Sequence, residues 1–352
     1  MIGTWTFTFV TSKNTLRTST SACQEMKAVY IKEFGGVENL EIQEVEDPQK
    51  PTGGQVLIRV RATGLNRADL MQRRGNYPPP PGYDPKIPGL EFAGDVAAVG
   101  EAVKDLKIGD RVFGITSGEA QAELVLVEAG LITKIPDALN FTEAAAVPEV
   151  FITAHDAVFT QAQLKSNETL LIHAVGSGVG LAGLQMAKAN GVTVIGTSRT
   201  AEKLERSQEF GLDHGIVAKD GQFAESVLAL TGDQGVDVIL DLVGGAYFEQ
   251  NLRCLRTKGR LMLVGLTSGA KAEFDLGHAL RKRLKIMGTA LRSRSLEEKS
   301  EAVRRFANQV VPLFESLKVR PNVDRVFSVS EVRAAHEYLE SNESFGKVIL
   351  EF

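Results

Sequence analysis

The pattern of apolar and polar positions is most informative over residues 170–199, LLIHAVGSGVGLAGLQMAKANGVTVIGTSR. Residues 170–174 form a short apolar run, which is typical of a strand buried on both faces. Residues 192–196 predict a second buried strand. Between the two strands, apolar residues follow a glycine turn at helical spacing: Val179, Ala182, Gly183, Met186 and Ala187. A strand, a glycine turn, a helix and a strand in this order form the first half of a dinucleotide-binding unit.

The glycine turn contains the residues expected to bind a dinucleotide pyrophosphate: Gly176, Ser177, Gly178, Val179 and Gly180. Glycines let the backbone approach the phosphates, and the first N–H groups of the following helix point at them with the positive end of the helix dipole. The strict G-x-G-x-x-G string is absent. An ordinary tight turn in an α/β domain is therefore the alternative interpretation.

The first part of the chain has a β pattern. In residues 55–62, apolar and polar side chains alternate, so one face of this strand is expected to be buried. Further short strands within residues 26–147 are separated by Gly and Pro turns. Many short strands with such turns predict a barrel-like domain.

The second part alternates strands with helices. Residues 148–290 predict a doubly wound parallel sheet, in which strand 260–264 would be free to pair with another chain if it lay at the edge. Residues 291–352 are expected to return to the first domain. They contain a predicted helix over 297–318 and a predicted strand over 348–352.

Length and composition fit this interpretation. The 352 residues exceed what one compact core usually holds, and 43% apolar with 24% charged residues is typical of a globular protein. The net charge of −4 does not favour a nucleic-acid partner, and no apolar run is long enough to span a bilayer. Cys23 and Cys254 are too few for a disulfide framework. They indicate a reducing compartment, so we expect a cytoplasmic protein.

Residues 1–25 differ from the rest of the chain. They are rich in Ser and Thr and contain no acidic residue before Glu25. Such a leader is compatible with a transit peptide for mitochondria or another organelle, although it contains a single Arg. The alternative is a disordered, unprocessed tail, because Met26 opens a segment that reads like a natural start.

Three residues at the end of the second strand bear on the choice of cofactor. NAD-binding units place an Asp or Glu about 20 residues after the glycines, where it bonds the ribose 2′-hydroxyl. Here that region contains Ser198, Arg199 and Lys203 and no acid. A hydroxyl and two cations suit a 2′-phosphate, so we expect NADP(H). Solvated charges at the start of a helix are the alternative.

Four segments together resemble one family: HAVGSGVG, LNRADLMQRRGNYPPP, PGLEFAG and LRSR. Over residues 26–352 the chain resembles the zinc-free quinone oxidoreductases, the zeta-crystallin-like branch of the medium-chain dehydrogenase/reductase superfamily. The tumour-suppressor-inducible quinone oxidoreductases are the most similar group. The resemblance implies an α/β protein with a GroES-like β-barrel-type catalytic domain and a Rossmann domain. It also implies NADPH bound between the domains, and a homodimer.

The same resemblance implies that no metal is bound. Zinc-dependent members of the superfamily bind zinc through a Cys, a His-Glu pair and a further Cys. Asn66 and Leu90 replace the Cys and the His here, and Glu91 alone remains. A catalytic zinc needs about three protein ligands.

Hydrogen bonds would then have to activate the substrate. Asn66 supplies an amide donor and Tyr77 a phenol. Asp69 is expected to order the loop by capping a helix. A cap or turn role for Asn66 and a packing role for Tyr77 are the alternatives.

Further cofactor contacts are expected at the carboxyl ends of strands and near the return to the first domain. These residues are Thr153, Gly244, Gly245, Val264, Gly265, Leu266, Leu291 and Ser293. A basic interdomain linker is the alternative interpretation of the last two.

The leading hypothesis is therefore an NADPH-dependent quinone reductase that transfers hydride without a metal, or one electron at a time to give a semiquinone. A 2-enoyl-thioester reductase with Tyr77 as proton donor is the first alternative. A non-catalytic protein that binds a dinucleotide or RNA is the second, although the charge balance does not favour RNA.

Overall fold

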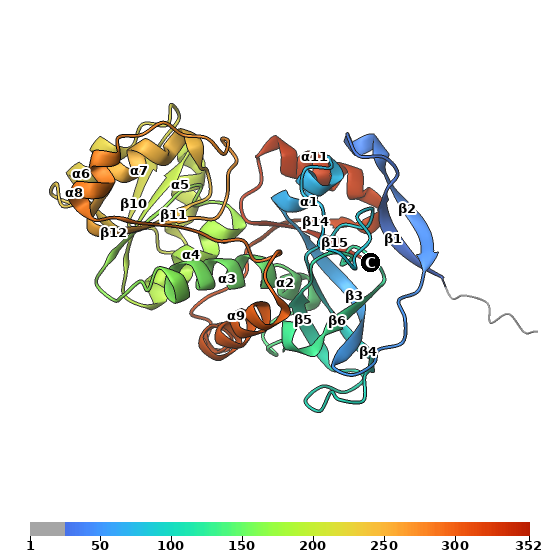
Figure 1. Ribbon diagram of the computed structural model, residues 1–352. Coiled ribbons are helices and arrows are strands. Elements are labelled where there is room, and N and C mark those ends of the chain that lie inside the picture. Colours follow the sequence, from blue (N-terminus) through green and yellow to red (C-terminus); the bar gives the residue numbers. More distant parts are fainter. Residues whose placement is uncertain (1–24) are drawn as a thin grey trace, which may run out of the picture.

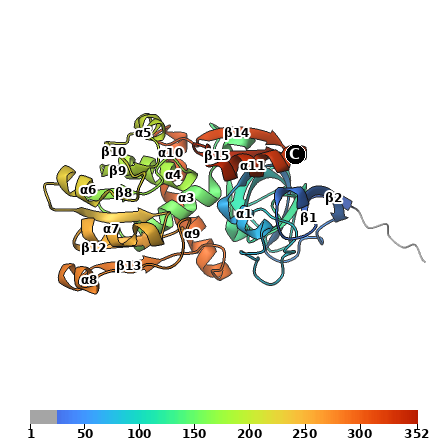
Figure 2. The same cartoon turned by 90° about the horizontal axis from the view of Figure 1, so that it is seen from above.

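The structure, a computed structural model, describes residues 25–352. It consists of two bodies that lie side by side, each built on its own large β-sheet (Figures 1 and 2). The leader or tail expected over residues 1–25 lies outside the described residues, apart from Glu25 at the start of β1.

The first body is centred on a seven-stranded sheet in the order β14-β15-β3-β4-β5-β7, with β6 paired to β3. Strand β3 (Gln55–Leu65) buries alternate side chains from Val56 to Ala62, as its pattern predicts. One half of β3 pairs with β6 and the other half with β15, so the sheet curls into a barrel-like form. The other strands of this body are β1 (Glu25–Ile31), β2 (Leu40–Glu46), β4 (Glu91–Val99), β5 (Arg111–Ile115), β6 (Leu124–Glu128), β7 (Ile132–Lys134), β14 (Val323–Ser328) and β15 (Lys347–Glu351).

The second body contains a six-stranded parallel sheet in the order β10-β9-β8-β11-β12-β13. The chain enters at β8, runs to one edge and then returns to fill the other side. The order therefore reverses between β8 and β11, as in a doubly wound dinucleotide-binding fold. Its strands are β8 (Thr169–Ile172), β9 (Thr193–Ser198), β10 (His214–Val217), β11 (Val236–Asp241), β12 (Leu255–Leu263) and β13 (Lys285–Gly288).

Helices cover both faces of this sheet and connect the two bodies (Figures 1 and 2). The helices are α1 (Arg67–Arg73), α2 (Phe141–Ala145), α3 (Pro148–His155), α4 (Gly178–Ala189), α5 (Ala201–Gln208), α6 (Ala224–Leu230), α7 (Phe248–Cys254), α8 (Leu276–Lys282), α9 (Leu296–Gln309), α10 (Val311–Glu315) and α11 (Val332–Ser341). A π-helical segment, Asp156–Gln161, continues α3.

Two expectations differ in detail from the structure. The strand predicted at residues 260–264 is not an edge strand, because β12 begins at Leu255 and lies between β11 and β13. The single helix predicted over 297–318 is two helices, α9 and α10. Pro312 lies in the first turn of α10 and cannot continue α9, because it lacks an N–H group and its ring clashes with the preceding turn. The predicted return of the chain as a final strand is confirmed, since β15 pairs antiparallel with β3.

The two bodies share a hydrophobic core. The core of the first body extends from β3 and β4 to Phe151 of α3 and to Ala182 and Met186 of α4. Phe151 also packs edge-on against Phe314, with ring centroids 4.9 Å apart. The start of α4, where the dinucleotide is expected, is therefore held against the first body.

Candidate active site

The predicted pyrophosphate loop connects β8 to α4. Ser177 caps α4 and accepts a hydrogen bond from the Gly180 N–H at 3.2 Å. A Cβ at Gly180 would lie 2.6 Å from the carbonyl oxygen of Val175, so the tight turn requires glycine there. Within the described part of the chain, the N–H groups of Gly178 and Val179 have no acceptor. Two donors at the positive end of a twelve-residue helix fit a pyrophosphate.

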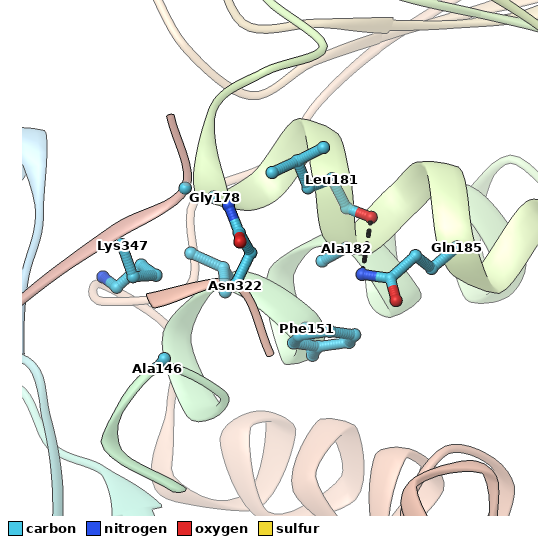
Figure 3. A pocket seen from close by; sticks show the side chains of 10 residues that line it. Ala146, Phe151, Gly178, Leu181, Ala182, Gln185, Asn322 and Lys347 are labelled. Atoms are coloured by element: carbon cyan, nitrogen blue, oxygen red, sulfur yellow. Dashed lines mark hydrogen bonds between the residues drawn. The ribbon is translucent and has the colours of Figure 1, made fainter. Parts of the chain in front are cut away.

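The segment that enters β15 covers this loop. The Gly346 N–H donates to the Gly176 carbonyl at 3.0 Å, and a Cβ at Gly176 would lie 2.9 Å from the Phe345 ring. Figure 3 shows Lys347 beside Gly178, next to a cavity of about 10 Å³, which is room for a single water molecule. The pyrophosphate loop therefore contacts a segment of the first body directly.

Ser198 and Arg199 lie at the carboxyl end of β9, as expected. Ser198 is buried, and its Oγ accepts a hydrogen bond from the Thr200 N–H at 3.3 Å. Arg199 is exposed. Among residues 25–352, no hydrogen-bond or ion-pair partner exists for its guanidinium. Arg199 is thus available to an external anion.

Lys203 has a different environment from the one expected. Its Nζ donates to the carbonyl oxygens of Asn342 at 2.6 Å and Ser344 at 2.7 Å. Desolvation and then the charge of Arg199 lower the pKa of the ammonium. Lys203 thereby ties α5 to the segment before β15, and two of its three protons are already engaged.

The remaining strand-end residues share one edge of the parallel sheet. Gly244 and Gly245 follow β11, and Val264, Gly265 and Leu266 follow β12. The Gly244 N–H donates to Asp241 Oδ1 at 2.9 Å, and the Val264 N–H donates to the Asp241 carbonyl at 2.9 Å. Asp241 therefore holds both turns beside the glycine loop, at the edge where ligands bind in this kind of sheet.

Thr153, Leu291 and Ser293 lie at the boundary between the bodies. Thr153 is half-buried on α3, which packs against α4. Leu291 is buried in the shared core, whereas Ser293 is exposed. A larger cavity of about 550 Å³ lies nearby, between the π-helical segment, the end of β13 and α9, and none of the predicted cofactor residues lines it.

Arg292, which lies between Leu291 and Ser293 in the sequence, fixes the position of Tyr77. The buried guanidinium donates to the carbonyls of Ser117 at 2.8 Å and Tyr77 at 2.9 Å, and to Gln72 Oε1 at 2.6 Å. It also lies over the Tyr77 ring, 4.9 Å from the centroid. In the described part of the structure the Tyr77 hydroxyl has no hydrogen-bond partner. The phenol is therefore held by its ring and backbone and remains free to donate.

Asp69 caps the N-terminus of α1, as expected, and it does so together with Asn66. The Asn66 N–H donates to Asp69 Oδ2 at 2.7 Å, and the Gly89 N–H donates to Asp69 Oδ1 at 3.0 Å. Burial raises the pKa of Asp69 to about 6, against the effect of these hydrogen bonds. The Asn66 amide donates to Glu91 Oε1 at 2.8 Å and to the Gly64 carbonyl at 3.2 Å. The Asn66 amide, which was expected to donate to the substrate, therefore donates to Glu91 and Gly64 of the protein instead.

Glu91 and Lys347 form a buried ion pair beside Asn66. Lys347 Nζ lies 2.7 Å from Glu91 Oε1 and 2.8 Å from Asn66 Oδ1, and the two charged side chains are 4% and 0% exposed. Within residues 25–352, no group of three His, Cys, Asp or Glu side chains is placed to hold a metal ion. An ammonium already occupies the position between the two oxygen donors. These residues do not fit a zinc ion.

Glu149 is a titratable residue that sequence reasoning missed. It lies in the first turn of α3, half-buried, and its N–H donates to Glu91 Oε2 at 2.8 Å. Burial and then the Glu91 charge raise the pKa of the Glu149 carboxyl to about 8. Burial and then the electrostatic effect of Glu149 raise the pKa of Tyr77. A protonated carboxyl therefore lies near the free phenol at neutral pH.

Three residues of this site were not predicted from the sequence: Glu149, Arg292 and Lys347. Only Arg292 lies in a segment that the sequence analysis had identified. Arg292 lies in the LRSR segment, whose Leu291 and Ser293 were the residues singled out. Glu149 and Lys347 carry no local motif. Their partners Glu91 and Asn66 are distant in the chain, and only the fold brings these side chains together.

The fold and this site define a class of protein: a two-domain oxidoreductase with a dinucleotide site at the carboxyl edge of its parallel sheet. The family model for the alcohol dehydrogenase GroES-like domain matches residues 52–137, and that for zinc-binding dehydrogenases matches residues 178–308.

Two relatives cover nearly the whole chain. The synaptic vesicle membrane protein VAT-1 homolog-like of Mus musculus is 32% identical over 93% of this chain and 82% of its own length. The quinone oxidoreductase of Rattus norvegicus is 31% identical over 92% of this chain and 97% of its own length. The chain belongs to the zinc-binding dehydrogenase family, within the medium-chain dehydrogenase/reductase superfamily. The expected family and fold class are confirmed.

Solved structures with the same fold cover nearly the whole chain. The Escherichia coli quinone oxidoreductase complexed with NADPH superposes with a TM-score of 0.81 at 29% identity, over 93% of this chain and 99% of that one. The CurK enoyl reductase superposes with a TM-score of 0.82 at 25% identity, over 93% and 99%. Within residues 25–352, no helix combines the length and apolar character needed to cross a membrane.

Proposed function

We propose that this chain reduces quinones with NADPH and without a metal. The observation that carries the proposal is the Tyr77 hydroxyl, which is free to donate while Arg292 fixes its ring and backbone. A quinone is already electron-poor, so a preorganised donor beside its oxygen is sufficient help for hydride transfer. The rat and Escherichia coli quinone oxidoreductases support this choice of substrate class.

The dinucleotide would lie across the carboxyl edge of the parallel sheet. The N–H groups of Gly178 and Val179 would hold its pyrophosphate, and Ser198 and Arg199 its 2′-phosphate. Thr153, at the domain boundary, would border the nicotinamide. The further expected contacts are Gly176, Ser177, Gly180, Gly244, Gly245, Val264, Gly265, Leu266, Leu291 and Ser293. NADPH supplies a hydride when it is bound.

Two side chains of the protein would complete the reaction. The Tyr77 hydroxyl donates a hydrogen bond to the quinone oxygen, where negative charge develops. Glu149 holds a proton at neutral pH because burial and the Glu91 charge raise its pKa to about 8. One hydride and one proton convert a quinone into its hydroquinone. Glu149, directly or through Tyr77, would supply that proton.

The test is NADPH oxidation by the purified chain, with a naphthoquinone in one assay and a crotonyl thioester in the other. We expect turnover with the quinone and little turnover with the thioester. Turnover with the thioester alone would overturn it.

The second candidate is a 2-enoyl-thioester reductase. The free Tyr77 hydroxyl and the similarity to the CurK enoyl reductase favour it. In that reaction Tyr77 would donate its proton to the substrate α-carbon after hydride reaches the β-carbon. The same pair of assays separates the two candidates.

A homodimer in a reducing, cytoplasmic compartment is the proposed setting. Strand β13 is an edge of the parallel sheet, and nearby Leu276 and Leu280 of α8 are 71% and 79% exposed (Figure 2). An unpaired edge strand beside exposed apolar side chains suits a two-fold contact with a second copy. Leu280→Asp should give a monomer in light scattering after gel filtration, and a monomeric parent would contradict the dimer.

A further inference from the structure

Three distant segments meet at Asn342. This residue ends α11 in the left-handed conformation, with φ of 64°. The guanidinium of Arg67, from the first body, donates to Asn342 Oδ1. Lys203, from the second body, donates to the Asn342 carbonyl at 2.6 Å. Two cations from opposite bodies thus lie on either side of one residue.

Arg199 belongs to the same group of charges. Partial desolvation and then the charge of Arg199 lower the pKa of Arg67, and the same two causes in the same order lower the pKa of Lys203. The nearest carboxylates have other partners. Glu340 pairs with Arg73 and Arg74, and Asp324 pairs with Arg206 and Tyr338. Glu202, which also acts on Lys203, pairs with Arg206. Within the described residues, none of Arg67, Arg199 and Lys203 forms an ion pair with an acid, so the three form a cluster of like charges.

The three cations are not equally available. Lys203 is engaged by two backbone carbonyls. Arg67 is exposed and has one hydrogen bond, to a neutral amide oxygen, while Arg199 has none within the described residues. Two exposed guanidinium groups with donors to spare match a phosphate group, which arginines bind through paired N–H groups.

We propose that Arg67, from the first body, supplies a further cation to the 2′-phosphate subsite that Arg199 begins, while Lys203 ties α5 to the segment before β15. The inference rests on the NADPH dependence proposed above. It makes the subsite bipartite, since the phosphate would lie between the strand end of the Rossmann domain and helix α1 of the catalytic domain.

This position has a consequence for the active site. Arg67 directly follows Asn66. The Asn66 side chain accepts a hydrogen bond from the Lys347 ammonium and donates one to Glu91. An interaction that holds Arg67 against the adenosine end of the cofactor also holds the cap of α1 in place. The 2′-phosphate would therefore stabilise the catalytic domain against the dinucleotide domain, and NADH would lack this contact.

The test is the dissociation constants of NADPH and NADH for Arg67→Ala, measured by quenching of protein fluorescence. We expect about tenfold weaker NADPH binding and unchanged NADH binding, because a charge-assisted contact to a phosphate is lost. Arg74→Ala removes the same charge at the other end of α1, where Glu340 is the partner, and should change neither constant. Asn342→Gly accepts the left-handed φ of 64°, removes the Oδ1 contact together with the Nδ2 hydrogen bond to the Glu340 carbonyl, and should retain the preference for NADPH.

The outcomes separate this inference from the proposed function. Equal affinity of the parent chain for NADPH and NADH would remove the cofactor proposal itself. A parent that prefers NADPH, with Arg67→Ala retaining the preference, would overturn only the role of Arg67. An equal loss for both dinucleotides, or the same loss in Asn342→Gly, would make Arg67 a structural tether and overturn the inference as well. Calorimetry with 2′,5′-ADP and 5′-AMP repeats the comparison without the nicotinamide.

Discussion

The expected dinucleotide site and the proposed substrate site of this protein are built in opposite ways. The glycine loop, its helix and the end of β9 lie within 30 residues of one another, and each contact depends on local spacing. The substrate site joins Asn66, Glu91, Glu149 and Lys347, and the Glu91–Lys347 pair spans 256 positions. The pyrophosphate loop and Arg199 are therefore local in the sequence, whereas Arg67 of the proposed 2′-phosphate subsite and the buried charges of the proposed substrate site depend on the assembled fold.

The strongest test of this comparison is to break the buried ion pair. Lys347→Met should lower the free energy of unfolding by about 3–5 kcal/mol, because it leaves the Glu91 carboxylate buried and unpaired. The midpoint of urea unfolding measures the effect, with exposed Lys318→Met as the control. Adding Glu91→Gln to the first variant should recover part of the loss, because it removes the buried charge and keeps an amide oxygen as acceptor. A loss below about 1 kcal/mol in Lys347→Met would contradict the importance of the network.

The next effect concerns the free phenol. Tyr77→Phe should slow quinone reduction by less than about tenfold, because one hydrogen bond is lost. It should slow any thioester reduction by about a hundredfold or more, because a proton donor is lost. Initial rates with both substrates give the comparison. A hundredfold loss with the quinone would show that Tyr77 does more than donate a hydrogen bond.

A smaller effect is expected from pH. The raised pKa of about 8 keeps Glu149 protonated at neutral pH, so the quinone rate should fall as pH rises through about 8. In Glu149→Gln this fall should disappear and the rate at pH 7 should be several-fold lower. Glu297→Gln, on the exposed start of α9, is the matched control. An unchanged profile in Glu149→Gln would exclude it as the proton source.

No effect at all is expected from a chelator. The donor set around Lys347 does not fit zinc, so EDTA should leave the quinone rate unchanged and added zinc should not raise it. Activity that is lost with EDTA and restored by zinc would contradict this reading of the site.

The sequence predicts the fold well where a pattern is continuous. The alternation in residues 55–62, the apolar runs of β8 and β9 and the helical spacing of α4 each correspond to the observed element. Strand β13 escaped prediction because Lys285–Gly288 is short and exposed. Its presence moves β12 away from the edge.

The site is predictable only in its local part. Ser198 and Arg199 lie where spacing from the glycines puts them, but spacing cannot show that Lys203 turns to the carbonyls of Asn342 and Ser344. In the same way, the sequence suggests that the Asn66 amide is free to donate to a substrate, whereas in the fold it donates to Glu91. A side chain's partner depends on contacts between residues far apart in the chain.

The most direct test of the account is the ratio of kcat/KM for NADPH to that for NADH, measured with a naphthoquinone and EDTA. The account predicts turnover with NADPH and a ratio of at least about ten, equivalent to ~1.4 kcal/mol. No turnover with either dinucleotide, or a ratio of one, would contradict it.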